Sequence, residues 1–106
     1  MAKYLVAASY TAEGAKGLLK DGGTKRRQAA EQAIKSAGGK LEAFYFAFGE
    51  NDVYIIVDAP DHATVASVSM AINASGAVRT KTVVLLSPEE IDQATKKAIT
   101  YKAPGH

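Results

Sequence analysis

Three tyrosines, one aspartate and one arginine are the side chains of this sequence best suited to hold a small molecule. Tyr10 ends an apolar run, and Tyr45 and Tyr54 flank a turn that Asp52 closes. A tyrosine ring packs well in an apolar pocket while its hydroxyl points inward, and Arg79 suits an anionic group. Packing in a core or interface is the alternative for the tyrosines, and a purely structural turn is the alternative for Asp52.

Arg79 stands two residues before Lys81, so an extended chain puts both side chains on one face of a strand. If that face is covered, the guanidinium needs a carboxylate partner or an anionic ligand. A structural pair with Glu42, Asp52 or Asp58 is the more common of these two arrangements.

No metal or other cofactor is expected. Asp58, Asp61 and His62 are the nearest approach to a ligand cluster, but Asp61 stands where a helix N-cap belongs and would leave His62 exposed at the first helical position. The chain has no cysteine, which excludes disulfides, thiolate ligands and thiolate nucleophiles and is typical of a cytoplasmic protein.

Two glycine-rich or basic stretches resemble anion sites only in part. Residues 17–24 lack the lysine of a phosphate-binding loop and follow a helical pattern rather than a strand. The run Lys25-Arg26-Arg27 begins a predicted helix, where the helix dipole favours acids. The run is therefore either a solvated charged face or a contact with an anion or an acidic neighbour.

Length and composition indicate one globular domain over residues 1–100, followed by a loose tail over residues 101–106. The chain has 106 residues, of which 47% are hydrophobic and 23% charged. Its net charge of +2 is too small to indicate a nucleic-acid partner, and no apolar run has the roughly 20 residues that cross a bilayer.

The periodicity of apolar residues predicts the order β-α-β-β-α-β with an additional C-terminal helix. Strands are expected over residues 4–10, 41–48, 53–58 and 77–86. Helical stretches are expected over 12–20 and 24–37, with Thr11 and Thr24 as caps, and over 61–75 and 88–100. This order is that of an α+β, ferredoxin-like split β-α-β sandwich with a four-stranded antiparallel sheet.

Neither side of this sheet is plainly polar, although helices cover only one side of such a fold. In the second strand one alternating set is Leu41, Ala43, Tyr45 and Ala47, and the other is Glu42, Phe44, Phe46 and Phe48. A sheet with one wet face should alternate between apolar and polar residues. We therefore expect a second copy of the chain to cover the free face, since most soluble oligomers are two-fold homodimers.

The sequence resembles the GYD domain family of small bacterial and archaeal proteins, which has no settled biochemical role. The resemblance covers nearly the whole chain, and the matching segments are residues 10–14, 48–52, 58–61 and 76–82. Of the Gly-Tyr-Asp turn that names the family, Gly49 and Asp52 are present, and Asn51 occupies the usual position of the tyrosine. The resemblance implies a dimeric α+β barrel.

Three functions compete at this stage. The first is a homo-oligomeric module that binds a small organic or anionic molecule between sheet and helices. The second is a cofactor-independent enzyme, similar to monooxygenases or isomerases, in which Arg79 or a tyrosine stabilises an oxyanion on a small aromatic substrate. The third is an RNA-binding sheet, which the low net charge and the sequence of residues 53–57 disfavour.

Overall fold

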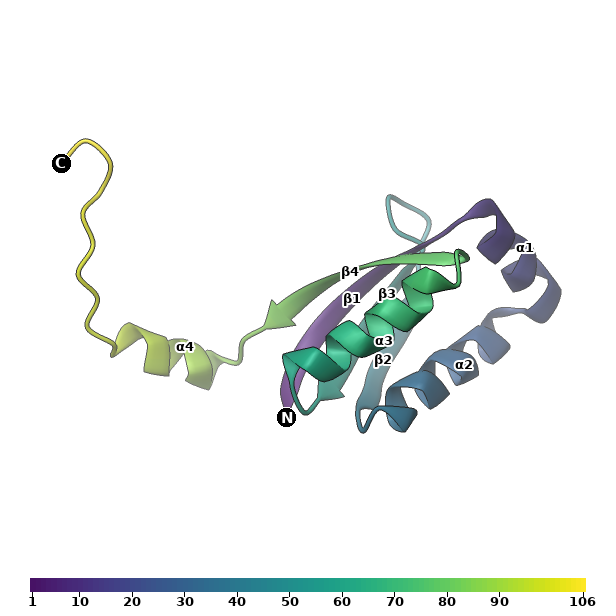
Figure 1. Cartoon of the computed structure of the whole chain (residues 1–106), viewed down its shortest axis with the longest axis horizontal. Coiled ribbons are helices and arrows are strands. Elements are labelled where there is room, and N and C mark those ends of the chain that lie inside the picture. Colours follow the sequence, from purple (N-terminus) through teal and green to yellow (C-terminus); the bar gives the residue numbers. More distant parts are fainter.

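The computed structural model describes all 106 residues and contains one four-stranded antiparallel sheet. Its strands are β1 (Ala2–Tyr10), β2 (Lys40–Phe46), β3 (Val53–Ala59) and β4 (Val78–Leu85). The spatial order is β2-β3-β1-β4, so β1 and β3 form the centre of the sheet (Figure 1). The predicted α+β fold of the ferredoxin-like type is confirmed.

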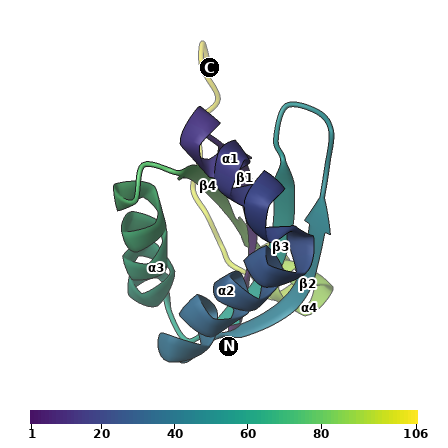
Figure 2. The same ribbon diagram turned by 90° about the vertical axis from the view of Figure 1, so that its right-hand side faces the viewer.

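Three helices lie over one face of the sheet (Figures 1 and 2). They are α1 (Ala12–Asp21), α2 (Gly23–Ser36) and α3 (His62–Ala74). The fourth helix, α4 (Pro88–Thr95), follows β4 and lies beyond the end of the sheet. None of the four helices combines the length and the apolar character needed to cross a membrane.

Most of the predicted helix starts are confirmed by their hydrogen bonds. The Thr11 side chain accepts a bond from the Gly14 amide, and Asp61 accepts one of 2.8 Å from the Thr64 amide. Hydrogen bonding to Thr64 also lowers the pKa of the Asp61 carboxyl. At α4, Ser87 forms the expected reciprocal capping box with Glu90.

The predicted cap at Thr24 is wrong. The second helix begins one residue earlier, at Gly23, and its N-cap Gly22 makes no side-chain hydrogen bond. Gly22 has φ of 81°, a left-handed conformation that glycine adopts without steric cost. Gly22 is therefore both the C-cap of α1 and the N-cap of α2. Because glycine has no side chain, α2 has no side-chain cap.

The second strand is shorter than predicted and contains a β-bulge between Leu41 and Ala43. The bulge reverses the alternation at one point, so that Leu41 joins Phe44 on the side of the helices. Ala43 and Tyr45 pair opposite Ile56 and Tyr54. The alternating sets expected from the sequence are therefore correct from Ala43 to Phe46 and wrong at Leu41 and Glu42, since Glu42 bonds Lys3 on the other side of the sheet.

A small hydrophobic core lies between the sheet and the helices. Its buried residues are Tyr4, Ala8, Ile34, Val53, Ile55, Val57, Ala59 and Val78. The Tyr4 ring is 1% exposed, and its hydroxyl lies 2.6 Å from Nδ1 of His62 at the start of α3. This hydrogen bond satisfies a buried hydroxyl and connects β1 to α3.

The opposite face of the sheet, called the open face here, has no helix over it. The register places its residues in rows that run across the strands: Leu85, Lys3 and Asp58; Val83, Leu5, Ile56 and Ala43; Lys81, Ala7, Tyr54 and Tyr45; and Arg79 with Ser9. The central rows are largely apolar, and Tyr45 is 71% exposed.

Residues 86–106, called the arm here, extend away from the rest of the chain (Figure 1). The longest dimension of the molecule is 56 Å, and its radius of gyration is 17.0 Å. A compact chain of this length has a radius of gyration of about 13 Å. The arm therefore does not cover the open face.

Two glycines of α1 provide a matched test of this packing. A Cβ on Gly14 would lie 2.0 Å from the backbone oxygen of Ala77, whereas a Cβ on Gly17 would meet nothing within 4 Å. We expect Gly14→Ala to lower the free energy of unfolding by at least about 2 kcal/mol, because the clash is with backbone. Gly17→Ala should raise it by about 0.5–1 kcal/mol through helix propensity.

Urea unfolding of both variants at one protein concentration measures the difference. Equal effects of the two substitutions would show that α1 does not lie against the start of β4 as described.

Candidate functional site

A cleft of about 460 Å³ lies between the helices and the sheet. Its floor comes from β1, β3 and β4, and its walls come from α1, α2 and α3. Most of its lining is apolar, and the charged exceptions are Glu13 and Asp21 of α1 and Arg26 of α2. This volume falls within the range of about 300–1,000 Å³ that is typical of small-molecule sites.

The cleft exists because the helices present small residues to the sheet. Gly14 and Gly17 of α1 and three alanines of α2, Ala29, Ala30 and Ala33, line it. Ile34 is the only large α2 side chain that is fully buried. Interiors are usually filled to crystal-like density, so a row of alanines over a sheet leaves volume that larger side chains would fill.

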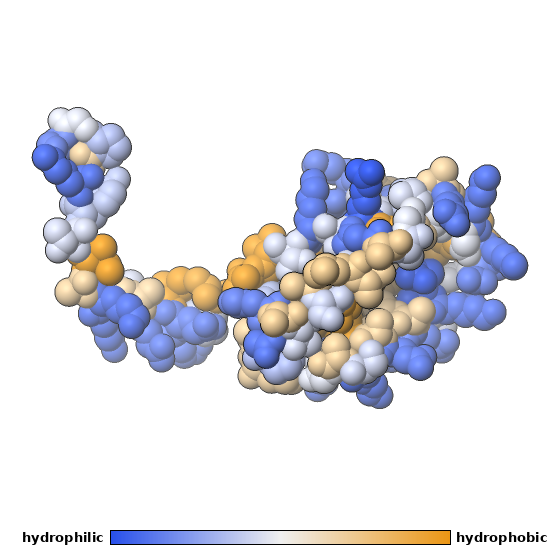
Figure 3. Space-filling view, in the orientation of Figure 1, coloured by the Kyte–Doolittle hydropathy of each residue, from blue (hydrophilic) through white to orange (hydrophobic).

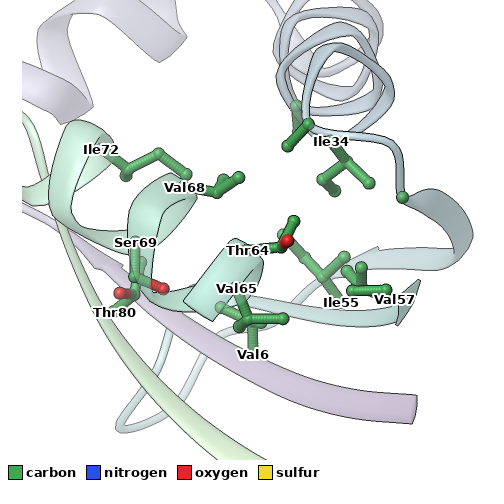
Figure 4. A pocket seen from close by; sticks show the side chains of 14 residues that line it. Val6, Ile34, Ile55, Val57, Thr64, Val65, Val68, Ser69, Ile72 and Thr80 are labelled. Atoms are coloured by element: carbon green, nitrogen blue, oxygen red, sulfur yellow. The ribbon is translucent and has the colours of Figure 1, made fainter. Parts of the chain in front are cut away.

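The cleft continues into a smaller apolar cavity of about 50 Å³ between α2 and α3 (Figure 4). In this view Val68 and Ile72 of α3 lie across from Ile34 of α2. Ile55 and Val57 lie on the strand beneath them. Ile72 and Ala30 line both spaces, so an apolar group that enters the cleft can reach inward between the two helices.

Arg26 is the polar feature of the cleft that its surroundings leave unsatisfied. Its Nε atom is buried and has no hydrogen-bond partner. Neither Glu13 nor Asp21, which line the same cleft, forms an ion pair with it. A buried donor without a partner costs about 1–3 kcal/mol, and more for a charged group. The Nε–H group of Arg26 is therefore a donor without an acceptor in this cleft.

Of the residues predicted as a binding site, Tyr10 lies at the cleft. It is half-buried, packs against the core and lines the end formed by Gly14 and Ala77. Asp52 lies nearby and has a structural role, because its Oδ2 accepts a hydrogen bond of 2.8 Å from the Tyr10 amide. Asp52 thus fixes the end of β1 and does not line the cleft.

The other predicted residues, Tyr45, Tyr54 and Arg79, lie on the open face. Tyr45 and Tyr54 are direct neighbours across β2 and β3. Asn51 joins this surface, since its side-chain amide donates to the Tyr54 hydroxyl at 3.2 Å and its Oδ1 accepts from Ser9. The sheet therefore separates these three residues from Tyr10, and the five residues do not form one pocket.

Within the chain Arg79 forms no ion pair with Glu42, Asp52 or Asp58. Lys3 takes two of the three candidates: it forms an ion pair with Glu42 and lies 3.3 Å from Asp58. The hydrogen bond to Glu42 raises the pKa of Lys3. The pKa of the Asp58 carboxyl is lowered, mainly by its interaction with Glu42 and to a smaller extent by its hydrogen bond with Lys3. The register places this trio at the opposite end of β1 from Arg79, which has no ion pair.

The structure contains no group of three or more histidine, aspartate and glutamate residues close enough to hold a metal ion. Asp61 serves as the N-cap of α3, and His62 bonds to Tyr4. Asp58 belongs to the trio with Lys3 and Glu42. Each member of the Asp58, Asp61 and His62 cluster therefore has a structural partner.

Sequence reasoning missed Glu13, Asp21 and Arg26 as a set. The available signal was the basic run Lys25-Arg26-Arg27 at a helix start, where acids are favoured. That run indicated an anion or an acidic neighbour. The sequence could not show that Glu13 and Asp21 of α1 line the same cleft as Arg26. The turn at Gly22 brings the two helices together.

Comparisons with known proteins agree with this architecture. The family model described as the GYD domain matches residues 4–95, which is nearly the whole chain. No curated protein matches the chain. No solved structure matches it either. Since the match runs from β1 through α4 and so includes the sheet, the cleft and the open face, the chain belongs to the GYD domain family.

Proposed function

We propose that this GYD domain binds a small, largely apolar organic molecule in the cleft between its helices and its sheet. The observation that carries the proposal is the buried Nε of Arg26, which lacks a hydrogen-bond partner inside an apolar cleft of about 460 Å³. Few precisely placed polar groups in an apolar cavity are the usual composition of a ligand site.

The charged groups of the cleft suggest the class of ligand. Arg26 requires an oxygen acceptor, and a carboxylate or a phenolate gives the strongest bond to a guanidinium. Glu13 and Asp21 are acceptors and suit a hydroxyl or amino donor on the same molecule. Small aromatic acids that also carry a hydroxyl combine all three properties with an apolar ring.

A catalytic role for this cleft has less support. The residues expected to stabilise an oxyanion were Arg79 and the tyrosines of the sheet, and only Tyr10 lies at the cleft. The open face supplies Tyr45 and Tyr54 as stacking surfaces for RNA, but the chain's net charge of +2 is low for a nucleic-acid partner.

The proposal includes a homodimer that forms through the open face. In the isolated chain Tyr45, Tyr54 and Val83 of this face are exposed, while the helix-covered face holds the core. Exposed apolar patches of several hundred Å² usually mark interaction sites. A second open face offers matching apolar rows, and burial of each Å² contributes about 25 cal/mol.

Arg26→Met tests ligand binding, with Arg27→Met as its control. We expect hydroxybenzoic acids, screened at millimolar concentration, to raise the melting temperature of the native chain by a few degrees, because they bind the folded state alone. Arg26→Met should weaken binding by about tenfold to a hundredfold through loss of a charge-assisted hydrogen bond. Arg27, which does not line the cleft, should be replaceable without effect.

Isothermal titration calorimetry with the best acid measures both affinities. Equal affinities for the native chain and the Arg26→Met variant would refute the assigned contact, and an absence of any hit among the acids and phenols would refute the ligand class.

Ile56→Lys tests the dimer, with Met70→Lys as its control. Ile56 lies in the central apolar row of the open face, whereas Met70 is exposed on α3. A lysine at position 56 would have to be desolvated in the interface, so we expect at least a hundredfold weaker dimerisation. Sedimentation equilibrium over a micromolar concentration series measures this change. A monomeric native chain throughout the series would contradict the proposed pairing.

A further inference from the structure

We infer that the arm, residues 86–106, docks on a second copy of the chain, with α4 at the edge of the partner's open face, beside the partner's Arg79 and Lys81. This inference rests on the proposed pairing of open faces and adds a second contact region to it. The evidence is the projection of the arm, the side chains that it exposes and the charges that it carries.

The arm exposes hydrophobic side chains that its own chain leaves uncovered. Leu86, Ile91, Ile99 and Tyr101 are all exposed, with Tyr101 at 75%. Figure 3 shows hydrophobic atoms along the connection from the sheet to α4 and again where the tail begins. A solvated tail has no need of such residues, whereas a segment that packs against another surface requires them.

The helix at the start of the arm is organised before any contact is made. Ser87, Pro88 and Glu90 provide a complete capping box with proline in the first turn. Helices of only eight residues are marginal in water, and strong caps compensate for part of that cost. A preformed helix also loses less conformational entropy when it docks.

The area of the open face indicates that a face-to-face contact alone is small. Four strands at the usual spacing and length present a face of about 500 Å². A stable complex buries about 800 Å² on each partner. The arm contributes apolar side chains of the kind needed to make up the difference, provided that it lies on the partner.

Charge selects where on the partner the arm can lie. The helix α4 carries Glu89, Glu90 and Asp92 and no basic residue. One end of the open face carries Arg79 and Lys81, both exposed and without an ion pair. The other end carries Glu42 and Asp58, whose charges Lys3 and Lys40 balance; Lys40 pairs with Asp58 in the ladder between β2 and β3. The acidic helix is therefore attracted more strongly to the Arg79 end than to the Lys3 end.

The topology allows this arrangement in a two-fold dimer. The arm leaves the sheet beside Lys3, because Leu85 pairs with Lys3 in the ladder between β1 and β4. If the strands of the two copies run in opposite directions, the Lys3 end of one face lies over the Arg79 end of the other. The arm of each copy then emerges at the edge of its partner's open face, beside the partner's Arg79.

Cysteine cross-linking of the full chain tests this placement, since the chain has no native cysteine to interfere. The test pair is Ser9→Cys, next to Arg79 in the ladder, with Gln93→Cys on α4. Mild oxidation should give a covalent dimer. The control pair, Lys3→Cys with Gln93→Cys, should give none, and neither should each single variant.

Charge reversal provides a second measurement on the same chain. Arg79→Glu with Lys81→Glu should weaken dimerisation at least tenfold, and the addition of Glu89→Lys and Asp92→Lys should restore it. As a control, Lys96→Glu with Lys97→Glu, just after α4, should not restore dimerisation of the Arg79→Glu, Lys81→Glu variant.

The outcomes separate this inference from the proposed pairing. A covalent dimer from the Ser9 pair, with rescue by the second reversal, supports docking at Arg79. Three results would overturn the docking and leave the face pairing intact, provided that the chain still sediments as a dimer. They are an intrachain disulfide, no disulfide at all, or a covalent dimer from the Lys3 pair. A native chain that is monomeric at all concentrations overturns both.

Discussion

The burial of apolar side chains on both sides of one four-stranded sheet is the constraint from which the other features follow. On one side, helices α1, α2 and α3 cover Tyr4, Val53 and their neighbours. On the other side, Leu5, Ile56 and Val83 form a row that no element of the same chain covers. At about 25 cal/mol per Å², leaving such a face in water forfeits several kcal/mol. This imbalance is the reason for the proposed pairing of two chains, and the hydrophobic side chains of the extended arm add to it.

The two faces of the sheet have different chemical roles because different residues line them. On the helix side, small residues of α1 and α2 leave the cleft open, and Arg26 supplies one unsatisfied donor. On the open side, Tyr45 and Tyr54 lie in an apolar surface without a cavity, which suits contact with another flat surface. The proposed ligand site and the proposed dimer contact thus lie on separate faces of the sheet, so a substitution at one need not touch the other.

The order of elements and most of the caps could be predicted from the sequence, because hydrophobic periodicity and capping residues act locally. Thr24 was wrongly predicted as a cap because Gly22 performs the same turn through its backbone. The bulge after Leu41 could not be predicted, since it depends on how β2 pairs with β3. The predicted binding residues were split between the two faces for a similar reason: residue type identifies a suitable side chain, but only the register and the bulge assign it to a face. Arg26 was visible as part of a basic run, but the burial of its Nε atom depends on how α1, α2 and the sheet pack around the cleft.

The central claim concerns what covers the open face, and chemical modification of Tyr45 tests it most directly. In the isolated chain this side chain is 71% exposed, so a monomer should be nitrated at Tyr45 by tetranitromethane nearly as fast as the unfolded protein. The account predicts that, at concentrations where the chain is dimeric, Tyr45 is nitrated at least tenfold more slowly, and that dilution restores its reactivity. Rapid nitration of Tyr45 at every concentration would contradict the account.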